Sequence, residues 1–364
     1  MGDCWLGLLC PCLHMLWPAL SRGLASQVSD CFCRYSRSTQ CVTPTRRTNP
    51  LILVVGESLV DLVVRGDRLP EPHVGGSPLN VSIGLARLGA PVTLGTTLGN
   101  DAHGAMIRSH LAQNQVPVVE MAPMAPSSSV ATAKLNTEGV ATYDFSINWA
   151  PTTMAPIGAD VTALHTGSLA TALDPGAELV LASLAKQSES DDVTLTYDPN
   201  VRPALLGDRD DARGRVESVV GLVDVVKASD EDLQWLYPGR SYADIAAAWL
   251  ALGPSMVVVT RGPNGAYAVT SSAQAELATS QVDVVDTVGA GDSFMAGLLY
   301  SLQQLEFLGG KNSARLREID AATLELLLAR AVEVATITVG RAGADPPTIR
   351  EVSFGANGGS AGLA

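Results

Sequence analysis

Asp286-Thr-Val-Gly-Ala-Gly-Asp-Ser-Phe-Met-Ala-Gly297 combines a glycine-rich turn, a carboxylate and the start of an apolar helix within twelve residues. Small residues at Gly289, Ala290 and Gly291 allow the backbone to approach a ligand closely. The run that follows, up to Leu302, has the spacing of a buried helix, and the first N–H groups of such a helix have no carbonyl partners. These N–H groups and the helix dipole favour a bound phosphate. The segment therefore predicts a phosphoryl-transfer site.

Asp292 conflicts with a simple phosphate loop, because its carboxylate would repel a bound phosphate. The conflict disappears if Asp292 accepts the proton of an incoming alcohol, so we predict that it is a general base. The alternative is an ordinary aspartate that caps the first turn of a helix, which is a common arrangement.

Composition indicates a globular protein, since 46% of the 364 residues are hydrophobic and 17% are charged. The net charge of −13 lies mainly in residues 51–364, which excludes nucleic acid and anionic membrane as expected partners. All six cysteines fall within the first 41 residues. We expect residues 1–50 to be a disordered extension or an upstream mis-start, residues 51–354 to form the domain, and residues 355–364 to be a flexible tail of a cytoplasmic protein.

Buried strands alternate with helices along most of the chain. Leu51–Val55 is a continuous apolar run typical of a parallel strand, and Ser77-Pro78 predicts the N-cap and first residue of a helix that continues to Leu88. Further strands are expected at residues 92–96, 164–167, 193–197, 223–227 and 256–260. This alternation predicts an α/β fold with three layers, α/β/α, around a mostly parallel central sheet.

One stretch interrupts this alternation with a predicted hairpin, formed by strands at residues 130–135 and 140–145. Together with the residues that follow Asp61, it could form a small β-sheet lid, covering roughly residues 62–75 and 117–148, that closes over a substrate. An ordinary edge hairpin is the alternative. The exposed edges of such a lid also make it a candidate surface for a homodimer.

Two common nucleotide-binding motifs are absent from the sequence. No Gly-x-x-x-x-Gly-Lys-Ser/Thr segment occurs, and no Gly-x-Gly-x-x-Gly segment follows a strand. A P-loop nucleotide hydrolase and a dinucleotide-dependent dehydrogenase are therefore both disfavoured.

Asp61 interrupts an apolar segment, where a buried carboxylate needs hydrogen-bond donors. The hydroxyls of a polyol are suitable donors, while Gly75-Gly76 allows close backbone approach and the Asn80 amide can both donate and accept. A solvent-facing aspartate beside a plain glycine loop is the alternative.

The segments Gly75-Gly-Ser-Pro-Leu-Asn80, Ile83-Gly-Leu-Ala-Arg-Leu-Gly89 and Asp286–Gly297 resemble the PfkB (ribokinase-like) carbohydrate kinases, and the first two are similar to the fructokinase branch. The resemblance implies a ribokinase-like fold and transfer of the γ-phosphoryl group of ATP to a sugar, with D-fructose giving fructose 6-phosphate. It also implies that Asp61, Gly75, Gly76 and Asn80 line the sugar pocket, and that Asp198-Pro-Asn-Val-Arg202 lies beside the active site, where Arg202 could position phosphate or substrate. Tyr143 in the hairpin could face the sugar, and packing between the lid strands is the alternative.

The resemblance also implies ligands for ATP and metal ions. Nucleotide-binding residues are expected at Lys227, Thr260, Gly262, Gly265, Thr287, Gly289 and Gly291. Asp232 stands where the family has a glutamate that organises Mg²⁺ through water, and the neighbouring Glu231 is the alternative acid. Asp286 is a candidate K⁺ ligand. The shorter Asp232 departs from the family pattern.

Two other functions remain compatible with these motifs. A 2-keto-3-deoxygluconate kinase would need a cation for the substrate carboxylate, which Arg202 could provide. A catalytically inactive member that senses a sugar is the alternative from another class.

Overall fold

The computed structural model describes residues 50–355 except 66–69, 123–124, 136–140 and 280–281. The predicted N-terminal extension, up to residue 49, and the predicted tail from residue 356 lie outside the described residues. The described residues belong to one compact unit. None of the described helices is long and apolar enough to cross a membrane.

Among the described residues, the main sheet contains nine strands, parallel throughout except for two antiparallel strands at one edge. Its order is β13 (Gln274–Leu277), β12 (Ala266–Thr270), β11 (Met256–Thr260), β10 (Val225–Ser229), β9 (Thr194–Asp198), β8 (Val161–Gly167), β1 (Leu51–Val55), β4 (Val92–Thr96) and β5 (Val118–Glu120). The predicted mostly parallel sheet is thereby confirmed.

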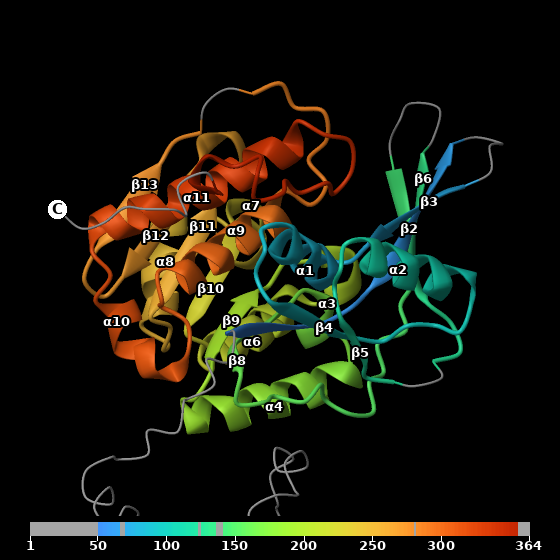
Figure 1. The fold of residues 1–364 in the computed structure, drawn as a ribbon, viewed down its shortest axis with the longest axis horizontal. Helices are drawn as coiled ribbons and strands as arrows, with labels where there is room; N and C mark the ends of the chain where they lie inside the picture. The colour runs from blue at the N-terminus through green and yellow to red at the C-terminus, as the bar shows by residue number, and fades with distance from the viewer. Residues whose placement is uncertain (1–49, 66–69, 123–124, 136–140, 280–281, 356–364) are drawn as a thin grey trace, which may run out of the picture. The chain divides into compact units, whose positions relative to one another are not determined.

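Helices cover both faces of this sheet (Figure 1). One layer contains α1 (Ser77–Arg87), α2 (Ala102–Gln113), α9 (Ala290–Gln304), α10 (Ser313–Arg317) and α11 (Ala321–Val339). The other contains α3 (Leu169–Ala172), α4 (Gly176–Ser190), α5 (Pro203–Leu206), α6 (Arg209–Val220), α7 (Asp230–Leu236) and α8 (Tyr242–Leu250). Short 3-10 helices span Gly262–Asn264, Gly310–Asn312 and Ser353–Gly355.

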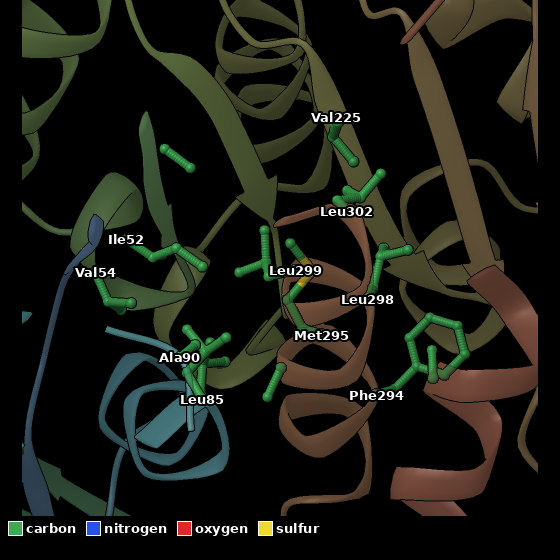
Figure 2. Packing of buried hydrophobic residues seen from close by; sticks show 14 of the residues in the cluster. Ile52, Val54, Leu85, Ala90, Val225, Phe294, Met295, Leu298, Leu299 and Leu302 are labelled. Carbon is green, nitrogen blue, oxygen red and sulfur yellow. The ribbon is translucent and has the colours of Figure 1, made fainter. Parts of the chain in front are cut away.

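The two helical layers require strands that are apolar on both faces. In β1, Ile52 and Val54 belong to the core on the α1 and α9 side, whereas Leu53 and Val55 belong to the opposite core. Successive side chains of a strand point to opposite faces, so an uninterrupted apolar run fills both cores. In Figure 2, Leu299 and Leu302 of α9 lie among the residues of the first core. The α9 helix that follows the glycine-rich turn is therefore anchored in the centre of the domain.

A second, four-stranded sheet has the order β3 (Glu71–Gly75), β2 (Leu59–Arg65), β6 (Ser129–Leu135) and β7 (Ala141–Ser146). These strands are seen beside α2 at the right of Figure 1. The predicted small sheet built from the hairpin and the residues around Asp61 is thus confirmed, although the turn at residues 136–139 lies outside the described residues. The stretch expected for the lid also contains β5, which instead pairs with β4 at the edge of the main sheet.

The packing of α1 on α9 depends on small side chains. A Cβ atom at Gly84 would lie 2.6 Å from the Cβ of Ala296, so this crossing has no room for another methyl group. We expect Gly84→Ala to lower the free energy of unfolding by about 1–3 kcal/mol through overpacking. Denaturant unfolding measures this change, and Gly84→Ala combined with Ala296→Gly should recover most of the loss.

Gly214→Ala is the matched control, because Gly214 is an exposed glycine of α6 with no atom within 4 Å of its Cβ position. Alanine there should leave the protein equally stable or stabilise it by up to about 1 kcal/mol. If Gly84→Ala were as stable as Gly214→Ala, the proposed tight crossing of α1 and α9 would be wrong.

Candidate active site

The N-termini of α1 and α9 meet at the carboxylate of Asp292. The Ser77 hydroxyl donates to Asp292 Oδ1 at 2.6 Å, and Asn80 Nδ2 donates to Asp292 Oδ2 at 2.8 Å. Ser77 and Asn80 lie three residues apart on one face of α1, so a single helical turn holds both oxygens of Asp292. Asp292 is buried, with 8% of its surface exposed. Its orientation is therefore fixed.

Two glycines make this meeting possible. Gly76 has a φ of 112°, and a Cβ there would lie 2.7 Å from the carbonyl oxygen of Glu57. Gly289 has a φ of 74°, and a Cβ there would lie 2.5 Å from the Cβ of Ala344. Any other residue would be strained at both positions.

The predicted N-cap role of Ser77 is wrong. The cap of α1 is Gly76, and Ser77 is the first helical residue. Because Gly76 takes the cap position, the Ser77 hydroxyl is free to reach α9. Sequence reasoning therefore missed Ser77 as a site residue.

The first turn of α9 contains the predicted anion-binding amides. The Ala290 N–H makes a long bond of 3.3 Å to the Thr287 carbonyl, while the Ser293 N–H donates to the Gly289 carbonyl at 2.8 Å. The N–H of Gly291 lies in the same turn, where a helix supplies no carbonyl partner. This turn can accept an anion.

Asp61 lies on β2 against the glycine pair. A Cβ at Gly75 would lie 2.4 Å from Asp61 Oδ2, so Gly75 leaves space for this carboxylate. Burial raises the pKa of Asp61, and the charges of Arg202 and His73 act in the opposite direction. Asp61, Gly76 and Asn80 line one cavity, as predicted for a common pocket.

Arg202 also lines this cavity, just before α5. Its guanidinium donates to the carbonyl of Val201 at 3.2 Å and, more weakly, to that of Asn200 at 3.4 Å. Tyr143 lies on β7 and pairs with Ala133 of β6, but its side chain is outside the part of the chain that the structure describes.

Lys227 forms a buried ion pair with Asp198, with Nζ 2.8 Å from Oδ2. Burial alone would lower the pKa of Lys227, but the charges of Asp198, Asp232 and Asp292 outweigh it, and the pKa is raised. The ammonium group therefore stays charged, and it lies 3.0 Å from the position of a Cβ at Gly291. Lys227 places a positive charge next to the first turn of α9.

Asp232 closes a capping box at the start of α7. Its Oδ2 accepts the N–H of Ser229 at 3.0 Å, and its Oδ1 accepts the N–H of Val201 at 2.8 Å. Each carboxylate oxygen of Asp232 already accepts one hydrogen bond but keeps a second lone pair. These lone pairs fit contact with Mg²⁺ through a bridging water. Glu231 is exposed and lines the same cavity. The described residues contain no group of three or more His, Cys, Asp or Glu side chains arranged for a metal ion.

Asp286 connects two loops next to the glycine-rich turn that precedes α9. Its Oδ1 accepts the N–H of Val288 at 3.0 Å, and its Oδ2 accepts the N–H of Gly343 at 2.9 Å. Its oxygens suit a hard cation, with lone pairs left over after these two bonds.

The cavity has a volume of about 1450 Å³. Of the predicted sugar and phosphate residues, Gly75 does not line it, whereas the following do: Asp61, Gly76, Asn80, Arg202, Gly289, Ala290, Gly291 and Asp292. It is also lined by the predicted nucleotide residues Thr260, Gly262, Gly265 and Thr287, and by the apolar residues Val282, Val284, Val288, Val332, Ala335 and Val339. Glu57 and Ser168 also line it and were not predicted.

Comparison with known proteins identifies the family of the chain. The sequence pattern of the pfkB family carbohydrate kinases matches residues 49–350. The chain belongs to this family. It is a fructokinase-like carbohydrate kinase, as its resemblance to the PfkB kinases implied.

Among curated proteins, the fructokinase of Rhizobium leguminosarum bv. trifolii is 34% identical over 278 residues, which cover 74% of this chain and 84% of the relative. The structure of Vibrio cholerae fructokinase with bound fructose, ADP and calcium is 26% identical, with a TM-score of 0.66 and coverage of 82% of this chain and 95% of the other. The fructokinase of Xylella fastidiosa with bound ATP shares the fold, with a TM-score of 0.69 at 24% identity and coverage of 81% of this chain and 94% of the other.

Removing Lys227 should destabilise the protein, because it leaves the buried carboxylate of Asp198 without its counterion. We expect Lys227→Met to lower the free energy of unfolding by about 3–5 kcal/mol at neutral pH, because Asp198 loses its counterion. Adding Asp198→Asn should recover most of this loss. Denaturant unfolding of the three proteins measures the difference.

The deficit should also depend on pH. Burial raises the pKa of Asp198 to about 6 even with Lys227 present, and the loss of Lys227 can only raise it further. A carboxyl whose pKa is higher in the folded state destabilises the protein as pH rises through that range. The deficit of Lys227→Met should therefore be larger at pH 8 than at pH 5, and an equal deficit at both would contradict the assignment.

Proposed function

We propose that this kinase transfers the γ-phosphoryl group of ATP to the primary hydroxyl of D-fructose, giving fructose 6-phosphate. The observation that carries the proposal is the position of Asp292 in the first turn of α9, where Ser77 and Asn80 hold its carboxylate at the cavity that Asp61 also lines. The fructokinases among its relatives support fructose as the sugar.

On the sugar side, Asp61 accepts hydrogen bonds from sugar hydroxyls, while Gly75 and Gly76 let the backbone approach the ring. Asn80 gives one N–H to Asp292, so its carbonyl oxygen and second N–H remain for the sugar. Asp292 then accepts the proton of the primary hydroxyl, a role worth roughly 10²- to 10⁴-fold in rate.

On the phosphate side, the amides of Gly289, Ala290 and Gly291 receive the charge that develops during transfer, assisted by the cation of Lys227. Thr260, Gly262, Gly265 and Thr287 hold the nucleotide. Asp232, through water, and Glu231 are the residues that would hold Mg²⁺, which neutralises phosphate charge when bound.

A monovalent cation is part of the proposal at Asp286. A form of Vibrio cholerae fructokinase with bound fructose, ADP and potassium is 25% identical to this chain, with a TM-score of 0.65. Asp286 ties together the loops at Val288 and Gly343, so a cation bound there would order the turn that precedes α9.

Two alternatives define the controls. The Arg202 guanidinium in the cavity could bind the carboxylate of 2-keto-3-deoxygluconate. An inactive sugar-sensing protein would not need the constrained Asp292.

We also propose that the edges of the lid sheet are a surface for a homodimer.

Asp292→Asn tests the base assignment. We expect turnover to fall by about two orders of magnitude or more, with folding and ATP binding preserved, because an amide cannot accept the proton. Steady-state kinetics and calorimetric titration with ATP measure the two effects.

Asp244→Asn is the matched control, since Asp244 also lies in the first turn of a helix and accepts a serine hydroxyl, from Ser241 at 2.7 Å. It lies outside the cavity, so its turnover should match that of the unmodified enzyme. Turnover of Asp292→Asn within a few-fold of this control would rule out a general base at Asp292.

A substrate panel tests the choice of sugar. With ATP and Mg²⁺, with and without K⁺, we expect the highest kcat/KM for fructose and lower values for 2-keto-3-deoxygluconate, ribose and adenosine. Asp61→Ala should raise the KM for the sugar by roughly 10- to 100-fold, the value of hydrogen bonds to a charged group, with the KM for ATP unchanged. A preference for 2-keto-3-deoxygluconate that Arg202→Met removes would replace fructose as the substrate.

A further inference from the structure

Glu57 is a buried acid in the cavity that the mechanism above does not use. It follows β1 and is 2% exposed. Glu57 lines the same cavity as Asp61 and Asp292, and its buried Oε2 has no hydrogen-bond partner among the described residues. Leaving a buried polar atom unpaired is costly, so proteins retain such atoms mainly where a ligand or a function uses them.

The surroundings of Glu57 hold it in place. The Ser168 hydroxyl donates to its carboxyl, and Oε2 is a buried oxygen without a hydrogen-bond partner among the described residues. Ser168 itself has a φ of 53°, and its N–H donates to the carbonyl of Asp198 at 2.9 Å. Strained, non-glycine backbone of this kind persists where the surrounding structure requires it, often at functional sites. On the other side, the Glu57 carbonyl packs against Gly76 of the predicted sugar loop.

We propose that Glu57 binds the sugar, with Oε2 accepting a hydrogen bond from a sugar hydroxyl other than the one that is phosphorylated. The proposal rests on the proposed function, because it requires a polyhydroxylated substrate in this cavity. It adds a second carboxyl to Asp61 as a determinant of which hydroxyls the substrate must carry.

The electrostatics provide a signature of this contact. Burial, with a smaller contribution from the charge of Asp292, raises the pKa of Glu57 to about 7, against the effects of its own backbone N–H, Ser168 and Arg202. Near neutral pH the free protein is therefore a mixture of protonated and ionised Glu57. A hydroxyl that donates to Oε2 stabilises the ionised form, so sugar binding should release protons near pH 7. The charged groups that act on Glu57 are Asp292 on α9 and Arg202 before α5.

Calorimetric titration with fructose, in buffers of different ionisation enthalpy and with a non-hydrolysable ATP analogue present, measures this release. We expect release near pH 7 from the unmodified enzyme and none from Glu57→Gln. The matched control is Asp224→Asn, a partly buried carboxyl outside the cavity that accepts the Leu195 N–H at 2.8 Å, and it should release protons as the unmodified enzyme does. Equal release from Glu57→Gln and the unmodified enzyme would overturn the proposal.

Deoxy analogues of fructose identify the hydroxyl. We expect Glu57→Ala to raise the KM for fructose by roughly 10- to 100-fold with an unchanged KM for ATP, as for a hydrogen bond to a charged group. One deoxy analogue should bind the unmodified enzyme and Glu57→Ala equally, because its missing hydroxyl is the partner of Glu57. Two results would show a structural role of Glu57 instead. One is that Glu57→Ala raises the KM for sugar and for ATP equally; the other is that the effects of Glu57→Ala and of the missing hydroxyl are additive for every deoxy analogue.

The two levels of proposal fail differently. Normal turnover of the unmodified enzyme with unaffected Glu57 variants overturns the role of Glu57 alone. If the unmodified enzyme neither binds nor phosphorylates any sugar of the panel, the proposed function is wrong, and the role of Glu57 falls with it.

Discussion

The contact of two helix N-termini through one buried carboxylate constrains the rest of the site. Asp292 on α9 is held by Ser77 and Asn80 on α1, more than 200 residues earlier in the chain. Because α9 also fills the centre of one core, the position of Asp292 depends on how tightly the two helices pack. Gly84 and Ala296 permit that packing. The proposed sugar-binding and phosphate-binding segments are thereby held together, which is the preorganisation that phosphoryl transfer needs.

Acidic residues lie near this contact, and the buried ammonium group of Lys227 offsets part of their charge. The charges of Asp198, Asp232 and Asp292 all raise the pKa of Lys227. Asp232 is further stabilised by two backbone N–H groups, so it takes part in the local structure as well as in the predicted Mg²⁺ site. An acidic cavity of this kind can accept a triphosphate only with positive charge from amides, lysine and bound cations together.

Local patterns predicted the strands well and the side-chain partners poorly. The run Leu51–Val55 is apolar at every position, as a strand between two helical layers must be, and it forms β1 as expected. Ser77 was misjudged because Ser-Pro is a frequent helix start, whereas the cap at Gly76 follows from its close approach to the Glu57 carbonyl. Lys227 was expected only as a nucleotide-binding residue, and its buried partner Asp198 becomes evident only from the pairing of β9 with β10. The burial of Glu57 likewise depends on elements far away in the sequence.

The most direct test of the central claim is a crystal structure with fructose and a non-hydrolysable ATP analogue. The account predicts the primary hydroxyl within hydrogen-bond distance of Asp292, about 2.6–3.2 Å, with Ser77 and Asn80 still bound to that carboxylate. The γ-phosphate should lie at the first turn of α9, in line with that hydroxyl. Fructose bound with its primary hydroxyl turned away from Asp292, while the phosphate occupies that turn, would contradict the account.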